Sequence, residues 1–228
     1  MQTSTRIVGS FVASLAVACT SATLAQGAPD AAPKAPPAPA AQAPAASGPV
    51  YVLFETSKGN ILLALDPAKA PVTVANFVKY VKGGFYDNTT FHRIVPNFVV
   101  QGGGFDDKFV QKKTEAPIKN EWQNGLKNVK GSISMARTPS PDSATSQFFL
   151  NLKDNPALDG ANGPGYAVFG RIVDGLEVMD AIAQSPTGRR EVTVTDGARV
   201  EFGDVPKIDV VITEAYEISK AEIGRAHV

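Results

Sequence analysis

The stretch of this sequence best suited to chemistry runs from Phe91 to Phe105 and reads Phe-His-Arg-Ile-Val-Pro-Asn-Phe-Val-Val-Gln-Gly-Gly-Gly-Phe. Side chains of an extended chain alternate in direction, which sets the face on which Arg93 lies. Phe98 and Gln101 reach that same face only if the strand bends, and the glycine triplet permits such a bend. We therefore expect an arginine beside an amide and an aromatic ring on a rigid wall.

An arginine in that position would act as a hydrogen-bond donor of fixed charge. Its guanidinium group is planar, always protonated, and does not transfer a proton to a reacting group. Such chemistry requires no nucleophile, metal or cofactor. The alternative is an ordinary arginine on a solvated strand face, which is the commoner arrangement for an arginine in a strand.

Composition argues against several other kinds of site. The chain has 22 Lys+Arg and 22 Asp+Glu, so its formal net charge is zero, which disfavours a nucleic-acid partner. One cysteine, Cys19, and two histidines, His92 and His227, cannot supply a Cys₄ or Cys₂His₂ zinc site or an intramolecular disulfide. No Ser/His/Asp arrangement is visible. We expect neither metal nor cofactor, and a structural role for His92.

The N-terminal residues predict export. Arg6 precedes an uncharged, mostly apolar run from Ile7 to Ala18, and small residues follow, which predicts a signal peptide over residues 1–25. The alternative is a lipoprotein signal that ends before Cys19, because the residues preceding this cysteine loosely match the lipoprotein pattern. A soluble product is favoured, and contact with a membrane is expected only through lipidation of Cys19.

Residues 26–49 predict a disordered spacer. Ten of these 24 residues are alanine and seven are proline, and none is aromatic or branched aliphatic. Such a segment cannot bury enough apolar surface to offset its loss of conformational entropy. Proline also keeps the chain extended, so the segment is expected to be a semi-rigid spacer.

Residues 50–218 predict one folded domain, and residues 219–228 form a tail without a strong pattern. Many strands, two helices and Gly-rich connections predict a mainly antiparallel sheet, closed or sandwiched, with helices over its open ends. Asp174 is the expected cap of the second helix. The expected strands are Val50–Thr56, Ile61–Leu65, Thr90–Val95, Phe98–Gln101, Ser132–Ala136, Phe148–Leu152, Ala167–Val173 and Ile208–Ile218, and the expected helices run from Pro71 to the Gly83-Gly84 pair and from Leu176 to Ala183.

Three ordered blocks of the folded part resemble cyclophilin-type peptidyl-prolyl cis-trans isomerases, in particular their exported bacterial members. The first is Phe-His-Arg, then Phe98, then Gln101-Gly-Gly. The second runs from Ser134-Met-Ala-Arg137 through Ser146-Gln-Phe-Phe149 to Leu158-Asp-Gly160, and the third is Tyr166-Ala-Val-Phe-Gly170. The resemblance covers residues 50–218. It implies an eight-stranded antiparallel closed barrel capped by two helices, with the active site on the outer face.

The resemblance also implies a function and a set of site residues. The protein would be a monomeric, periplasmic or otherwise exported isomerase that accelerates rotation of X-Pro bonds in folding polypeptides. Arg93 would stabilise the twisted imide, and Gln101 would hold the substrate backbone and steady Arg93. The expected substrate-binding residues are Phe98, Val99, Ala136, Arg137, Gln147, Phe149, Leu158 and Tyr166.

Alternative interpretations exist for the function of the protein and for the roles of individual residues. The protein could be a non-catalytic proline-peptide-binding or chaperone module on the same fold, although such a binder has no need of Arg93. Phe98, Phe149 and Leu158 could be ordinary core residues, and Phe148 is expected to be the interior member of the Phe148-Phe149 pair.

Two positions depart from the family pattern. Ala157 stands where cyclosporin-sensitive relatives have tryptophan, and Tyr166 stands where several eukaryotic relatives have histidine. The chain's single tryptophan, Trp122, lies elsewhere in the sequence. The resemblance therefore implies weak binding of cyclosporin.

Overall fold

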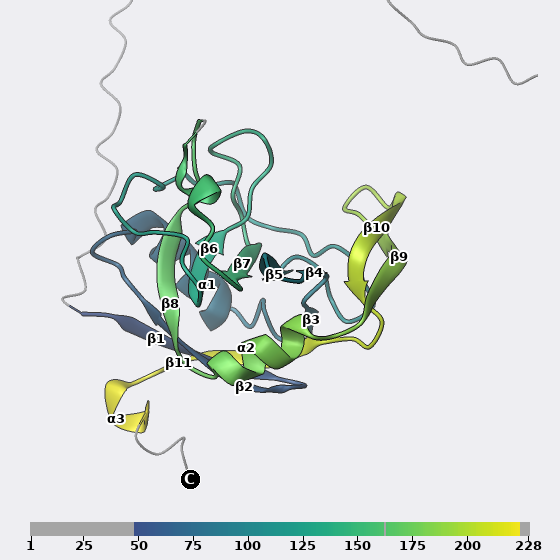
Figure 1. Cartoon of the computed structure of the whole chain (residues 1–228), viewed down its shortest axis with the longest axis horizontal. Helices are drawn as coiled ribbons and strands as arrows, with labels where there is room; N and C mark the ends of the chain where they lie inside the picture. Colours follow the sequence, from purple (N-terminus) through teal and green to yellow (C-terminus); the bar gives the residue numbers. More distant parts are fainter. Residues whose placement is uncertain (1–47, 162, 224–228) are drawn as a thin grey trace, which may run out of the picture. The chain divides into compact units, whose positions relative to one another are not determined.

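A computed structural model describes residues 48–161 and 163–223 (Figure 1). The predicted signal peptide and almost all of the predicted spacer lie outside these ranges. The elements in chain order are β1 (Val50–Thr56), β2 (Gly59–Leu65), α1 (Pro71–Lys82), β3 (Thr89–Thr90), β4 (Arg93–Val95), β5 (Val99–Gly102), β6 (Ser132–Met135), β7 (Phe148–Asn151), the 3₁₀ helix η1 (Pro156–Asp159), β8 (Val168–Asp174), α2 (Leu176–Ala183), β9 (Thr187–Thr193), β10 (Arg199–Pro206), β11 (Val211–Ile218) and α3 (Lys220–Ile223).

Nine strands form one antiparallel sheet in the order β3-β11-β1-β2-β8-β6-β7-β5-β4. The sheet curls strongly into a half-barrel, because its two edge strands, β3 and β4, are joined in the chain by Phe91 and His92 alone (Figure 1). The expected mainly β fold is confirmed. No helix among the described residues combines the length and the apolar character needed to cross a bilayer.

The predicted strand over Thr90–Val95 is wrong in one respect, because it is two strands. The backbone N–H of Thr90 donates to the carbonyl of Phe105 at 2.9 Å, and that of Phe91 donates to Val210, also at 2.9 Å. These bonds turn the chain between β3 and β4. The sheet therefore has nine strands rather than eight. Its two edge strands are connected by residues 91 and 92 of the chain and are not paired with each other by strand hydrogen bonds.

Aromatic side chains fill the inside of the curl. Phe54, Phe77, Tyr86, Phe148 and Phe169 are fully buried there, and the Phe77 ring lies 5.0 Å from the rings of both Tyr86 and Phe169. Helix α1 contributes Phe77 from its buried face. This packing confirms that Phe148 is the interior member of its pair. It leaves the outer face of β4, β5 and β7 free to carry other side chains.

The two principal helices begin and end where the sequence predicts, but for different local reasons. Proline at its first position starts α1, and the carboxylate of Glu121 accepts hydrogen bonds from the backbone N–H groups of Val72 (3.1 Å) and Thr73 (2.8 Å). Asp174 does not cap α2, contrary to the prediction. The N-cap is Gly175, whose φ of 85° favours glycine and whose missing Cβ makes room for the Asn60 carbonyl.

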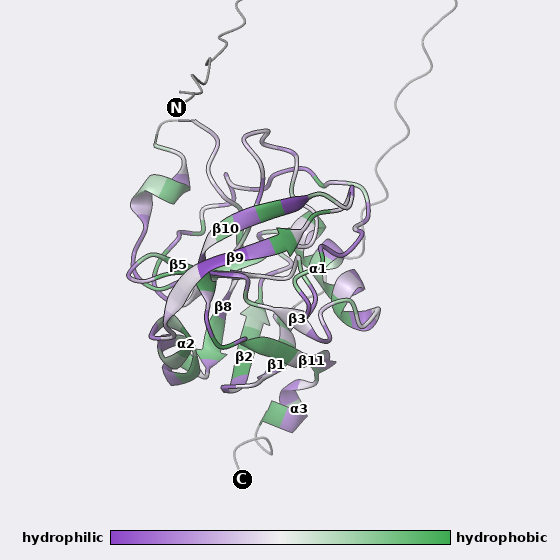
Figure 2. Cartoon of the chain, turned by 90° about the vertical axis from the view of Figure 1, so that its right-hand side faces the viewer, coloured by the Kyte–Doolittle hydropathy of each residue, from purple (hydrophilic) through white to green (hydrophobic). Residues whose placement is uncertain are grey.

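A two-stranded hairpin, β9 and β10, stands apart from the main sheet and was not predicted (Figure 1). Figure 2 looks at this hairpin from outside, and apolar and polar residues mix along both of its strands. Phe105, Phe109, Val192 and Val205 form a small buried cluster of their own beneath it. The hairpin is therefore packed against the domain and is not a free loop.

Candidate active site

Arg93 and Gln101 face each other across two neighbouring strands. They are directly paired in the antiparallel β4–β5 register, with Val95 paired to Val99 at the turn. Opposite residues of an antiparallel pair project from the same face, with Cβ atoms about 4.5–5.5 Å apart. The turn is tight, because Asn97 adopts φ of 57° and the Phe98 N–H donates to the Val95 carbonyl at 3.0 Å. The arginine and the amide thus share one surface.

A third polar side chain, Gln147, joins this pair from the start of β7. The amide nitrogen of Gln101 donates to the side-chain carbonyl oxygen of Gln147 at 2.9 Å. Gly104 makes this possible, because a Cβ at that position would come within 2.6 Å of the Gln147 side chain. The glycine triplet was predicted to permit a bend, and it has a second role in addition. It gives room for a glutamine as well as for a bend.

The expectation that Gln101 directly steadies Arg93 does not match the structure. Within the described residues, the guanidinium of half-buried Arg93 has no hydrogen-bond or ion-pair partner, and the side-chain hydrogen bond of Gln101 runs from its amide nitrogen to Gln147. All five N–H donors of the arginine are consequently available to a ligand.

Aromatic and aliphatic side chains form the neighbouring part of the surface. Phe149 on β7 is 5 % exposed and meets Tyr166 edge to face, with ring centroids 5.5 Å apart at 79°. Leu158 is tied to this pair by a 2.9 Å bond from the Tyr166 N–H to the Leu158 carbonyl. Phe98 and Leu158 are each half-buried, whereas Val99 is 3 % exposed. The predicted apolar residues are therefore brought together by backbone contacts.

The pairing of Ala136 and Arg137 with an extended peptide stays a prediction, and the structure shows the contacts that both residues make within the chain. The Ala136 N–H already donates to the backbone carbonyl of Gln147 at 2.9 Å. The Arg137 guanidinium lies 4.5 Å from the Tyr166 ring centroid and donates to the carbonyls of Thr138 (2.9 Å) and Pro164. The arginine side chain thus holds the loop that carries Tyr166.

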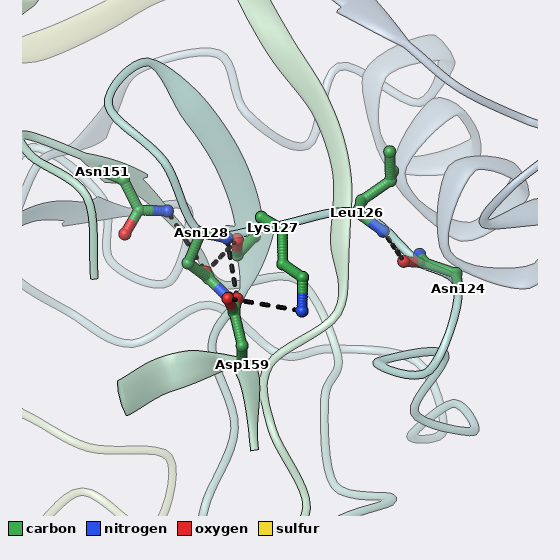
Figure 3. Close-up of polar contacts among 7 residues, drawn as sticks. Asn124, Leu126, Lys127, Asn128, Asn151 and Asp159 are labelled. Atoms are coloured by element: carbon green, nitrogen blue, oxygen red, sulfur yellow. Dashed lines mark hydrogen bonds and ion pairs between the residues drawn. The ribbon is translucent and has the colours of Figure 1, made fainter. Parts of the chain in front are cut away.

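Buried Asn128 lies at the centre of a network of polar side chains, and Figure 3 shows its contacts with Asp159 and Asn151. The Asp159 carboxylate accepts bonds from the backbone N–H (2.8 Å) and the side-chain amide (2.9 Å) of Asn128. The side chain of Asn151 donates to Asn128 at 3.2 Å, and that of Asn155 donates to Asn151 at 2.8 Å and to the Phe98 carbonyl at 3.1 Å. Sequence reasoning missed these asparagines, because most of these partners lie 23 to 57 residues away in the chain, the pair of Asn155 and Asn151 being the exception.

His92 lies beneath Arg93 and is 2 % exposed. Burial chiefly lowers the pKa of His92 from 6.5 to about 4, and the positive charge of Arg93 lowers it further, against a smaller opposing effect of a hydrogen bond with the Thr90 backbone. The ring is therefore neutral at physiological pH. It packs against Phe105, with ring centroids 4.7 Å apart. A neutral buried ring is compatible with the structural role predicted for it.

A groove of about 580 Å³ opens over the polar pair and is bounded on its far side by the hairpin. Arg93, Gln101 and Gln147 line it from the main sheet, and residues 201–204 of β10 line it from the other side. The sequence analysis did not identify this second wall. One signal was present, since Asp196-Gly197 is a typical hairpin turn and Gly197 has φ of 82°.

No group of three or more His, Cys, Asp or Glu side chains suited to a metal ion occurs within residues 48–161 and 163–223. The donor side chains of the groove include one guanidinium, that of Arg93, and three amides, those of Gln101, Gln111 and Gln147. This arrangement can hold a ligand rich in carbonyl groups and can direct a fixed positive charge at one of its atoms.

Comparison with known proteins gives a consistent result. The family model described as cyclophilin type peptidyl-prolyl cis-trans isomerase/CLD matches residues 51–216. The chain is 58 % identical over 144 residues to peptidyl-prolyl cis-trans isomerase A of Dickeya dadantii, covering 63 % of this chain and 76 % of that protein. It is 47 % identical over 165 residues to isomerase B of Escherichia coli, covering 71 % of this chain and 95 % of that protein.

The fold has a solved counterpart. A cyclophilin type isomerase of Cryptosporidium parvum, crystallised in the presence of the dipeptide Ala-Pro, superposes with a TM-score of 0.60 at 23 % identity. The alignment covers 75 % of this chain and 99 % of that one.

Proposed function

Because the chain belongs to the cyclophilin-type peptidyl-prolyl cis-trans isomerases, we propose that it rotates X-Pro bonds by directing Arg93 at the twisted imide. Isomerase activity follows from the family match over residues 51–216 and from the identity to bacterial isomerases. The proposal goes beyond this activity in the role of individual side chains and in the cellular setting.

Amide resonance is the barrier that the enzyme must lower. Rotation about a peptide bond costs about 18–20 kcal/mol, and an X-Pro bond isomerises in roughly tens to hundreds of seconds without a catalyst. Twisting breaks the conjugation, so the proline nitrogen becomes pyramidal and gains a lone pair. A donor that reaches this lone pair only in the twisted state lowers the barrier, because it stabilises the transition state more than the planar ground state.

The observation that carries the proposal is the guanidinium of Arg93, which has no hydrogen-bond or ion-pair partner among the described residues and lies on a surface fixed by its neighbours. Strand pairing fixes its backbone opposite Gln101, and the Gln101–Gln147 bond fixes the polar surface beside it. A preorganised donor of this kind loses little energy to reorganisation during the reaction. The neighbouring glutamines are suited to hold the carbonyl groups of the substrate backbone.

The apolar cluster next to the arginine is suited to the proline ring. Phe98, Phe149 and Leu158 present aromatic and aliphatic surface within one network of backbone bonds. The Cryptosporidium parvum counterpart was crystallised in the presence of Ala-Pro, and we assign a proline-containing peptide to this chain as substrate. A ring held here would keep its imide bond beside the polar pair.

Export is the proposed cellular setting. Arg6, the apolar run to Ala18 and the small residues that follow support a signal over residues 1–25, or lipidation of Cys19. The protein would then assist folding of exported polypeptides. Intact mass of the protein from its native host tests this, since either a start at Gln26 or a lipid on Cys19 is expected. A full-length chain would contradict both.

Exchange NMR on an Ala-Pro peptide tests the role of Arg93 directly. Arg93→Ala should lose most of kcat/KM, by about 10²–10³, which is the usual effect of removing one preorganised transition-state donor. The melting temperature should change little, because the guanidinium has no partner within the described residues. Activity close to that of the unmodified protein would contradict the proposal.

A further inference from the structure

We propose that the β9–β10 hairpin is a specificity wall of the substrate groove and that it favours peptides with a basic side chain close to the proline. This inference rests on the proposed function, because it assigns a preference to the same groove. Four observations carry it: the position of the hairpin, its attachment to the domain, a buried, uncharged histidine that borders the groove, and the charges of the hairpin.

The hairpin lies across the groove from the proposed catalytic surface. Glu201, Phe202, Gly203 and Asp204 line the same groove as Arg93. Phe202 packs edge to face on Phe105, with ring centroids 5.5 Å apart. A peptide bound at Arg93 therefore has the β10 residues beside it, and side chains near its proline must meet them.

Several contacts hold this wall in place. Arg190 on β9 lies 3.8 Å from the ring centroid of Phe109 and forms an ion pair with Asp209. The side-chain oxygen of Gln111 accepts bonds from the backbone N–H (3.1 Å) and the hydroxyl (2.9 Å) of Thr195 at the hairpin turn. A wall attached at both its strands and its tip can discriminate between ligands, because a shift to accommodate a poor ligand would break these contacts.

A buried polar side chain, that of His92, borders the groove and carries no charge at physiological pH. His92 lines the groove, is 2 % exposed, and its Nδ1 has no hydrogen-bond partner within the described residues. An unpaired buried polar group is costly, and most such groups in proteins have a partner. The neutral imidazole cannot repel a cationic substrate group, because burial keeps it uncharged.

The charges of the groove favour a cation on the hairpin side. Two carboxylates, Glu201 and Asp204, line the groove against one guanidinium, that of Arg93. Glu201 pairs with exposed Arg189 at 3.2 Å, whereas Asp204 has no ion-pair or hydrogen-bond partner within the described part of the chain. Asp204 also holds φ of 57°, a conformation that fixes the direction of its backbone. Exposed Asp204 thus adds a carboxylate without a partner in the described part of the chain to the lining of the groove.

Matched peptides test the preference. The probes are Ala-Pro tetrapeptides that carry Lys, Gln or Glu at each position flanking the Ala-Pro pair in turn, assayed at low and at physiological ionic strength. The kcat/KM ratio of the Lys peptide to the Glu peptide should be about two- to fivefold at one of these positions, which is the range expected of an exposed charge pair. The ratio should decrease with added salt.

Two variants separate the groove charges from the general charge of the hairpin. The double variant Asp204→Asn with Glu201→Gln should bring the ratio close to one, and asparagine tolerates the left-handed conformation at position 204. Glu191→Gln is the matched control, because Glu191 lies on β9 of the same hairpin, pairs with Arg199 at 3.7 Å, and is absent from the groove lining. It should keep the ratio of the unmodified protein.

Three results would overturn the inference. These are a ratio near one in the unmodified protein at every position, an unchanged ratio in the double variant, or an equal loss in the Glu191→Gln control. Failure of the proposed function looks different, because Arg93→Ala would then retain its activity towards all of these peptides whatever their charge.

Discussion

Gln101, the direct partner of Arg93 across the β4–β5 ladder, donates from its side-chain amide to Gln147 at 2.9 Å and forms no hydrogen bond with the guanidinium within the described residues. The two glutamines brace each other across β5 and β7, and the guanidinium remains free for a ligand. Support for the proposed catalytic arginine therefore comes from the shape of the wall and not from a hydrogen bond to its side chain.

Removal of Gln147 tests this bracing. Gln147→Ala should reduce kcat/KM by about fivefold, because loss of one hydrogen bond typically costs about 1 kcal/mol and the Gln101 amide would then move freely. The isomerisation assay measures this effect. Gln123→Ala is the control, since Gln123 is exposed and outside the groove lining. Equal activity of both variants would show that the glutamine pair has no role in the reaction.

The buried amide network should support substrate binding from a distance. Asn151→Ala leaves the amide of Asn155 and the carbonyl of Asn128 with fewer partners, which should lower the free energy of unfolding by about 1–3 kcal/mol. Because Asn155 also bonds to the Phe98 carbonyl, KM for a proline peptide should rise more than kcat falls. Urea unfolding and steady-state kinetics measure the two effects.

Exposed Asn60→Ala is the control for this change and should alter stability by less than about 0.5 kcal/mol. A fully stable Asn151→Ala variant with an unchanged KM would contradict a positioning role for the network.

The lowered pKa of His92 should appear as a pH dependence of stability. In the folded state His92 titrates at about 4, whereas in the unfolded chain it titrates near 6.5. As the pH falls, His92 therefore takes up a proton at a higher pH in the unfolded state than in the folded state. The free energy of unfolding should decrease as the pH falls from 6.5 to 4, by up to about 3 kcal/mol. Urea unfolding of the unmodified protein and of His92→Gln isolates this contribution, since carboxylates affect both alike. Parallel pH curves would argue against a neutral buried ring.

Local patterns in the sequence predicted the elements but not their partners. Pro71 and the glycines after Lys82 bound α1 correctly, because both act through their own backbone conformation. The Glu121 carboxylate that caps this helix comes from 48 residues away, and no local pattern encodes it. The Gln101–Gln147 bond spans 46 residues in the same way. The resemblance predicted both glutamines as site residues, but the contact between them is seen only in the folded structure.

The missed hairpin has a different cause. Arg189, Arg190 and Glu191 interrupt the alternation that marks a half-buried strand, and Gly203 weakens the pattern of β10. Its stability comes from a separate cluster around Phe105 and Phe109 rather than from the main sheet. Packing of this kind depends on residues distant in sequence, so periodicity alone does not reveal it.

Cyclosporin should bind weakly. Ala157 is exposed on η1 and offers neither the area nor the N–H of the tryptophan found in sensitive relatives, and loss of such an anchor commonly costs about 2 kcal/mol, or more than tenfold in Kd. The indole of Trp122 packs against Gly160, close to η1 but at a different position. Ala157→Trp should recover part of the affinity in a calorimetric titration. Nanomolar binding by the unmodified protein would contradict the assignment of position 157.

Arg93 is proposed to stabilise the twisted imide of the transition state and to contribute little to binding of the planar peptide in the ground state. Line-shape NMR over a titration that reaches saturating proline peptide measures both the exchange rate on the enzyme and the Kd. For Arg93→Ala and Arg93→Lys, the account predicts a loss of exchange rate of about 10²–10³ with Kd changed by less than about threefold, because lysine keeps the charge but lacks the planar fork. An exchange rate near that of the unmodified protein in Arg93→Lys, or a loss confined to Kd, would contradict it.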